Sequence, residues 1–138
     1  MQQLKLLKSQ LYSEGSHNGQ PADPALQGGR CRCGHVFFPM QTYGCERCGS
    51  YGDALMPHAL STQGTLLASA VVHLHADKNR PAPFTIVKVA LDDGPVVRTL
   101  LADDSGAIAL GQRMTAKLVP VQQADGETVL DLRFIAIT

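Results

Sequence analysis

The chain has 138 residues, of which 44% are hydrophobic and 17% are charged. Twelve Lys and Arg residues balance twelve Asp and Glu residues, so the formal net charge at neutral pH is zero. This composition is typical of one compact folded domain with a small addition, and it excludes a disordered chain. It offers no charged field for steering a polyanion or a membrane surface.

Residues 1–28 predict a short helix followed by a linker. Leu4, Leu7 and Leu11 recur at helical spacing within residues 1–14, and such an amphipathic helix needs a surface for its leucine stripe. Residues 15–29 are rich in Gly, Pro, Ser and Asn, as linkers are. The first residues are too short an apolar stretch for a signal peptide or a membrane span, and we expect a cytoplasmic protein without membrane contact.

Residues 29–60 predict a metal-binding ribbon. Its four cysteines form two pairs, Cys31-Arg-Cys33 and Cys45-Glu-Arg-Cys48, separated by eleven residues. Two residues between thiolates let both sulfurs reach one ion. Clustered cysteines without an export signal indicate metal binding before disulfides.

We therefore predict a structural Zn²⁺ site with the ligands Cys31, Cys33, Cys45 and Cys48. Four thiolates leave no open position for water or substrate, so the metal has no catalytic role. The first pair is one residue shorter than the usual two-residue spacing, and His35 is the alternative to Cys31 as a ligand. Three neighbouring arginines either offset the negative charge of the site or are plain solvated charges; they are Arg30, Arg32 and Arg47.

Residues 61–138 predict a small β-barrel. Five segments are β-branched, apolar or alternating, and turn signals separate them. They are residues 65–75, 84–91, 96–102, 114–122 and 128–137. Closure protects the edges of so short a sheet, so we expect a five-stranded OB-fold barrel, with a small sandwich as the alternative. The predicted fold is mainly β: an N-terminal helix, a rubredoxin-like zinc ribbon and the barrel.

Taken together, these segments resemble a family of acyl-CoA-associated zinc-ribbon plus OB-fold proteins, formerly a domain of unknown function. The resemblance covers roughly residues 1–137 and departs from the family at Cys31-Arg-Cys33, where the family has two intervening residues. The matching motifs are Gly29-Arg30-Cys31, Cys33-Gly34-His35-Val36-Phe37-Phe38-Pro39, Cys45 to Ser50, Ser61 to Leu66, Pro83-Phe84, Val89 to Pro95 and Leu110 to Met114.

The resemblance implies a subunit that is not an enzyme on its own. Members of this family accompany thiolase-superfamily enzymes and some aldolases that act on acyl-CoA substrates. The chain is then expected to scaffold such an enzyme, in a heterotetramer by analogy, and to shape the CoA or acyl channel at the shared interface. The Phe37-Phe38-Pro39-Met40 run, with the N-terminal helix, either forms a docking face or packs at the junction of ribbon and barrel.

Three other groups of residues have side chains suited to binding or catalysis. Lys78 and Arg80, in the loop after the first barrel strand, are candidates for binding the phosphates of CoA. His73 and His75 lie two apart on one strand face, more often a solvent-facing stripe than a site. The pairs Asp92-Asp93 and Asp103-Asp104 are typical of turns.

The rival prediction is a single-stranded nucleic-acid-binding protein, because zinc ribbons and OB barrels both serve that function. It requires a basic groove with aromatic side chains on the strands. The barrel has only Phe84 and Phe134 as aromatics and no positive net charge, so the phosphate contribution to affinity is largely absent. We therefore expect nucleic acid to be an unlikely partner.

Overall fold

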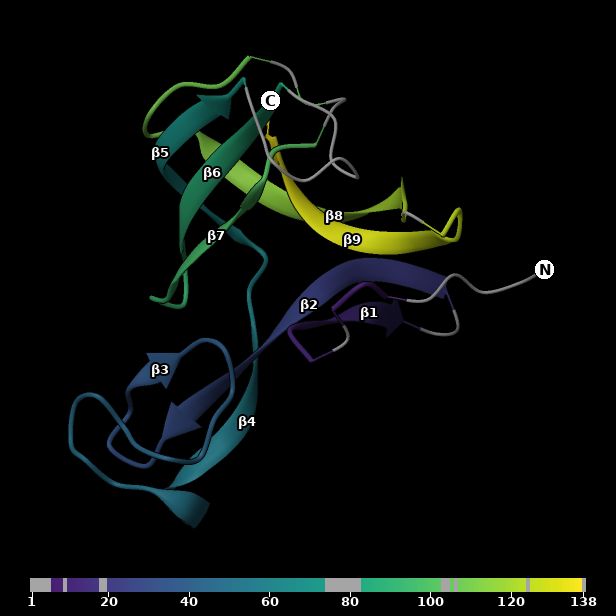
Figure 1. Ribbon diagram of the computed structural model, residues 1–138. Helices are drawn as coiled ribbons and strands as arrows, with labels where there is room; N and C mark the ends of the chain where they lie inside the picture. The colour runs from purple at the N-terminus through teal and green to yellow at the C-terminus, as the bar shows by residue number, and fades with distance from the viewer. Residues whose placement is uncertain are drawn as a thin grey trace.

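The structure is a computed structural model that describes residues 6–8, 10–17, 20–73, 83–102, 105, 107–123 and 125–137, with only the backbone of 14–17 and 20–23. It is mainly β (Figure 1). One sheet contains β1 (Tyr12–His17), β2 (Gln20–Cys31), β3 (Val36–Phe37) and β4 (Leu55–Leu60), with the 3₁₀ turn η1 (Gly52–Ala54) before β4. The other contains β5 (Gln63–Val72), β6 (Phe84–Leu91), β7 (Val96–Leu100), β8 (Arg113–Gln122) and β9 (Thr128–Ala136).

The second sheet forms a nearly closed barrel. Its strands follow the order β7-β6-β5-β8-β9, and every named neighbour pair is antiparallel. A parallel bridge between Leu101 and Phe134 brings the two outer strands together, and the Ala102 N–H donates to the Phe134 carbonyl at 2.9 Å. This order, with one parallel closing contact, is OB-like. The five predicted strands are therefore confirmed, most within one or two residues.

The barrel strands bury alternate residues, as a two-residue period requires. On β6 the side chains of Val87, Val89 and Leu91 are buried, while Lys88 between them is exposed. Met114 on β8 and Phe134 on β9 are fully buried in the same apolar cluster. Alternating burial of the kind seen on β6 fixes the register of a strand, because a shift by one residue would turn its apolar set outward.

The predicted N-terminal helix is wrong over the described residues. Leu6 forms a parallel bridge with Leu130, the Leu7 N–H donates to the Leu130 carbonyl at 2.8 Å, and Tyr12 already begins β1. Leu6 and Leu11 pack against the barrel core, and Leu4 lies outside the described residues. A short isolated helix is marginal in water. The edge of β9 instead offers backbone hydrogen bonds together with an apolar surface.

The predicted linker is also wrong, because residues 20–31 form the twelve-residue strand β2. Gly28 and Gly29 allow neighbouring residues to pack closely against β2. A Cβ at Gly28 would collide with the Phe37 carbonyl and the Leu60 side chain, and one at Gly29 with the Phe37 ring and the Met40 sulfur. Residues 52–60, within the predicted ribbon, form η1 and β4, and β4 pairs with β2 from Leu26–Leu60 to Cys31–Leu55.

Strand β2 belongs to two apolar clusters. Its Leu26 lies in the large cluster, which holds the barrel core together with Tyr12 of β1 and Leu60 of β4. Its last residue, Cys31, lies in a smaller cluster with Phe37, Cys45 and Leu55. Figure 1 shows the same arrangement: β2 begins beside β8 and β9 and runs out to the small sheet with β3 and β4. The strand therefore joins the cysteine-containing region rigidly to the barrel.

Candidate metal centre

The sulfur atoms of Cys31, Cys33, Cys45 and Cys48 lie within 4.8 Å of one another. The Cys31–Cys48 pair is separated by 3.5 Å and the Cys33–Cys45 pair by 3.8 Å. A tetrahedral zinc ion with metal–sulfur distances of about 2.3 Å holds neighbouring sulfurs about 3.8 Å apart. The donor set and its spacing therefore fit a tetrahedral metal ion bound by four thiolates.

The short first pair is built at the end of β2. The Gly34 N–H donates to the Cys31 carbonyl at 2.8 Å, and the Cys31 N–H donates to the His35 carbonyl at 2.8 Å. Gly34 has a φ of 98°, which closes this tight turn into β3 and which other residues adopt at a cost. One intervening residue is sufficient because Cys31 projects from the strand and Cys33 from the turn.

The second pair lies in a wider loop. The Cys45 N–H donates to the Ser50 carbonyl at 2.8 Å, and the Gly49 N–H donates to the Cys45 carbonyl at 2.9 Å, with a φ of 80° at Gly49. The Arg47 N–H points at the Cys45 sulfur over 3.4 Å. A backbone N–H that is directed at a sulfur, as that of Arg47 is, stabilises the thiolate form, as in metal-binding knuckles.

The geometry brings Cys31, and not His35, into the cluster. Cys31 is 2% exposed and faces Cys48. The His35 ring is stacked on Phe37, with centroids 6.2 Å apart, and is no member of the metal-binding group. The shortened spacing therefore does not remove Cys31 from the candidate site.

Without a metal ion, the thiols of the site have different pKa values because their surroundings differ. The Ser50 hydroxyl, 3.3 Å from the Cys48 sulfur, and then the Ser50 N–H lower the pKa of Cys48 to about 6. The Cys33 N–H acts to lower the pKa of Cys31, but burial and the shared protons of the other thiols outweigh it and raise that pKa to about 12. A metal ion must displace these protons to bind, so uptake is coupled to pH.

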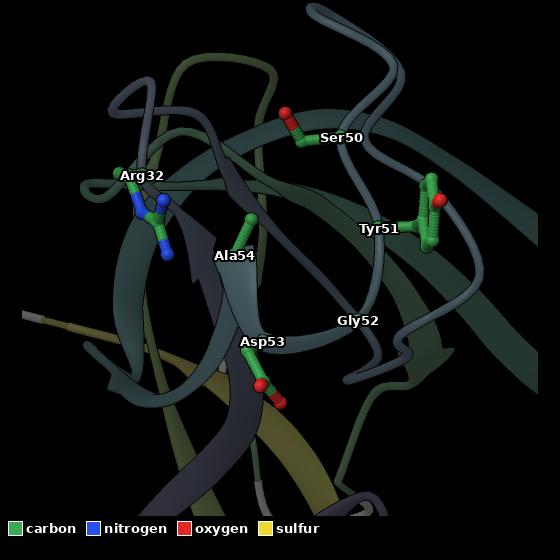
Figure 2. A pocket seen from close by; sticks show the side chains of 6 residues that line it. All are labelled: Arg32, Ser50, Tyr51, Gly52, Asp53 and Ala54. Carbon is green, nitrogen blue, oxygen red and sulfur yellow. The ribbon is translucent and has the colours of Figure 1, made fainter.

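Arg30, Arg32 and Arg47, beside the ligands in sequence, are all exposed. Arg32 lines a shallow cleft of about 530 Å³ with Ser50, Tyr51 and residues 52–54. Figure 2 shows the Arg32 guanidinium and the Tyr51 ring on opposite sides of this loop. None of the residues that line this cleft belongs to the cysteine cluster.

Of the two predicted roles of the Phe37-Phe38-Pro39-Met40 run, packing at the junction of ribbon and barrel agrees with the structure better than an exposed docking face. Phe37 is buried in the small cluster and Met40 packs against it. Phe38 packs against the barrel cluster, and Pro39, after a cis peptide bond, is exposed. The run therefore fills the junction between the metal-binding sheet and the barrel.

Only some of the other residues that were predicted as candidates for binding or catalysis are described by the structure. Lys78 and Arg80, predicted to bind CoA, lie outside them, as do His75, Asp103 and Asp104. His73 is exposed, without a described partner. Asp92 forms two hydrogen bonds with Arg113, at 2.8 and 2.7 Å, which lower the pKa of Asp92, and Asp93 accepts the Ser61 N–H. Both residues therefore lie in a turn, as predicted, but their carboxylates bind residues remote in sequence and not the backbone of the turn itself.

Two features of this region were not predicted from the sequence. The Ser50 hydroxyl is the polar partner of Cys48. The Gln41 side chain accepts the Tyr43 and Gly44 N–H groups at 2.8 and 3.0 Å and donates to the Gly44 carbonyl at 2.7 Å, which fixes the loop before Cys45. Ser50 lies two residues after Cys48, and Gln41 lies four residues before Cys45. A polar side chain close to a cysteine was the only feature of the sequence that could have indicated these roles.

Comparison with known proteins places the fold among solved structures. No protein-family model matches the sequence. A chain of a solved structure described as "Ltp2-ChsH2(DUF35) aldolase" has the same fold, with a TM-score of 0.60 and 21% sequence identity over 79% of this chain and 84% of that chain. Residues 61–138 are little more than half of the sequence, so the likeness extends beyond the barrel into the metal-binding sheet. Within the described residues there is no helix long and apolar enough to cross a membrane.

Proposed function

We propose that this protein is a non-catalytic subunit of an enzyme complex, in which a thiolase-superfamily enzyme or related aldolase acts on an acyl-CoA substrate. The observation that carries the proposal is the likeness of fold to the aldolase described as Ltp2-ChsH2(DUF35), a name that joins two components. The likeness covers 79% of this chain, which is more than the barrel alone.

The cysteine centre supports an accessory role. All four cysteines of the chain belong to one metal-binding group, so none of them is a separate nucleophile for acyl transfer. We assign Zn²⁺ to this site, because four thiolates at these distances suit it. With four protein ligands the ion is closed to substrate. Its contribution is to hold β2, β3 and the loop of residues 41–50 in place.

The alternative function, binding of single-stranded nucleic acid, has little support. Phe134 is fully buried and Phe84 is half-buried, so neither described barrel aromatic offers an open face for stacking bases. The net charge of zero provides no overall electrostatic attraction for a polyanion.

Co-expression tests the proposal. An affinity tag is placed on the thiolase-superfamily enzyme encoded nearest to this chain in the genome, and the untagged chain is followed through affinity and size-exclusion steps. We expect a stable complex, and a higher turnover of acyl-CoA by the complex than by the enzyme without the small subunit. Separate elution of the two chains at micromolar concentration would contradict the proposal.

A further inference from the structure

Two cations stand directly opposite each other on the outer face of the barrel. Lys88 of β6 pairs in register with Arg98 of β7, and both side chains are exposed. Residues directly opposite in an antiparallel pair point to the same side, and like charges there destabilise the sheet. Neither side chain has a hydrogen bond or an ion pair with another residue of the chain in the described structure.

A second like-charge pair shows that the barrel neutralises such pairs elsewhere. Lys117 and Arg133 are also opposite each other, on β8 and β9. There Arg133 Nε donates to Asp131 Oδ2 at 3.4 Å, so a carboxylate of the same sheet compensates part of the charge. Arg113 is likewise held by Asp92 at 2.7 Å. The contrast leaves the repulsion between Lys88 and Arg98 without an internal compensation.

The surface around these cations is partly apolar. Ala68 lies opposite Lys88 on the other side and is exposed, and Val96, two residues before Arg98 on the same face, is 46% exposed. Small molecules bind in concave sites, whereas protein partners bind to flat surfaces with an apolar centre and Arg side chains. The described cleft lies on the metal-binding sheet and not here.

We propose that the outer face of β6 and β7, around Lys88 and Arg98, docks a protein surface that carries closely spaced carboxylates. The inference rests on the proposed function, and the partner is the acyl-CoA-processing enzyme of the complex. When the two proteins associate, the partner's carboxylates neutralise the two cations. This removes the repulsion that destabilises the isolated barrel and therefore favours binding.

One substitution separates docking from folding. Lys88→Glu places a carboxylate opposite Arg98 and replaces a repulsive cross-strand pair with an attractive one. The thermal midpoint of the isolated chain should therefore stay the same or rise, while the dissociation constant for the tagged enzyme should increase about tenfold or more. Lys8→Glu, which makes the same charge change at another exposed lysine, is the matched control and should bind as the wild type does.

The outcomes are distinguishable. If the wild type binds the enzyme and Lys88→Glu binds equally well, the docking face is overturned and the proposed function stands. If Lys8→Glu weakened binding to the enzyme equally, the effect of Lys88→Glu would be explained by the change in net charge alone. The inference would then be overturned as well. If the wild type does not bind the enzyme, the proposed function and this inference fall together. Calorimetric binding of inorganic diphosphate to the isolated chain, abolished by Lys88→Glu, would reassign the face to a small phosphate ligand.

Discussion

The Tyr12 hydroxyl donates a hydrogen bond to Asp131 Oδ1 at 3.0 Å, across 119 residues of sequence. Both side chains are buried, and the second carboxylate oxygen of Asp131 accepts from Arg133. A buried carboxylate is costly unless it is paired. Here one partner comes from β1 and the other from β9 itself, so the charge is satisfied only when the N-terminal strands lie against the barrel.

Removal of that hydroxyl should loosen the junction. Tyr12→Phe keeps the buried ring and deletes a hydrogen bond to a charged group, which costs about 1.5–3 kcal/mol of unfolding free energy. Urea denaturation of the two proteins measures the difference. Tyr51→Phe, at a tyrosine that is 76% exposed, serves as the control and should leave stability unchanged.

The same residue should make the fold sensitive to alkali. Burial, followed by the negative charge of Asp131, raises the pKa of Tyr12 from 10.0 to about 12. The folded state thus favours the protonated phenol, so this contribution to stability is complete below pH 10 and is lost as the pH rises from 10 towards 12. Unfolding free energies measured across this interval should fall more steeply for the wild type than for Tyr12→Phe. Parallel curves would contradict the assignment.

Metal content should depend on Cys31 and not on His35. Cys31→Ser removes a sulfur that lies 3.5 Å from that of Cys48, whereas His35→Asn changes only a ring stacked on Phe37. We expect one zinc per chain in the wild type and in His35→Asn, and a loss of most of it in Cys31→Ser. Elemental analysis of the purified proteins measures it. Loss of zinc in His35→Asn with retention in Cys31→Ser would reverse the ligand assignment.

Chelation should unfold one part of the molecule. The small cluster around Cys31 has only four buried residues, two of them ligands, and cannot hold its loops without metal. The barrel cluster shares none of those residues. After zinc removal, amide exchange should accelerate over residues 31–55 and stay slow at Val87, Val89 and Met114. Simultaneous loss of protection in both regions would show that they unfold as one unit.

Gly64 should be intolerant of any side chain. A Cβ there would run into the backbone of Ala90 and Leu91, which the β5–β6 pairing holds in place. Gly64→Ala is expected to destabilise the protein by about 1–3 kcal/mol, because backbone atoms cannot move aside. Gly44→Ala is the matched control, since the space around Gly44 is open and its φ is not in the positive range. Its effect on the denaturation midpoint should be negligible.

The sequence was informative where the deciding interactions are local. Val87, Val89 and Leu91 alternate with polar or smaller residues and are followed by Asp92-Asp93-Gly94, so the strand and its end could both be predicted. The two residues between Cys45 and Cys48 likewise indicate, without reference to the rest of the chain, that both thiolates bind one metal ion.

The N-terminal region was mispredicted because its partners are remote. The spacing of Leu7 and Leu11 suits a helix, but the free edge of β9, about 120 residues later, determines what these residues do. Gly28 and Gly29 are typical of a linker in composition. The close approach of Phe37, with Leu60 at Gly28 and Met40 at Gly29, explains why glycine is needed there. The pairing of Lys88 with Arg98 depends on strand register, which no local pattern defines.

The contacts of Leu6 and Tyr12 with β9 also determine when the protein can finish folding. A chain emerges from the ribosome in order, so the first strands wait, with their apolar residues uncovered, until residue 136 has been made. The four candidate ligands and the other buried residues of the small cluster all lie within residues 31–55. They can close while the barrel is still being synthesised. We expect metal supply during translation to set the yield of folded protein, because metal that arrives later meets chains already committed to aggregation.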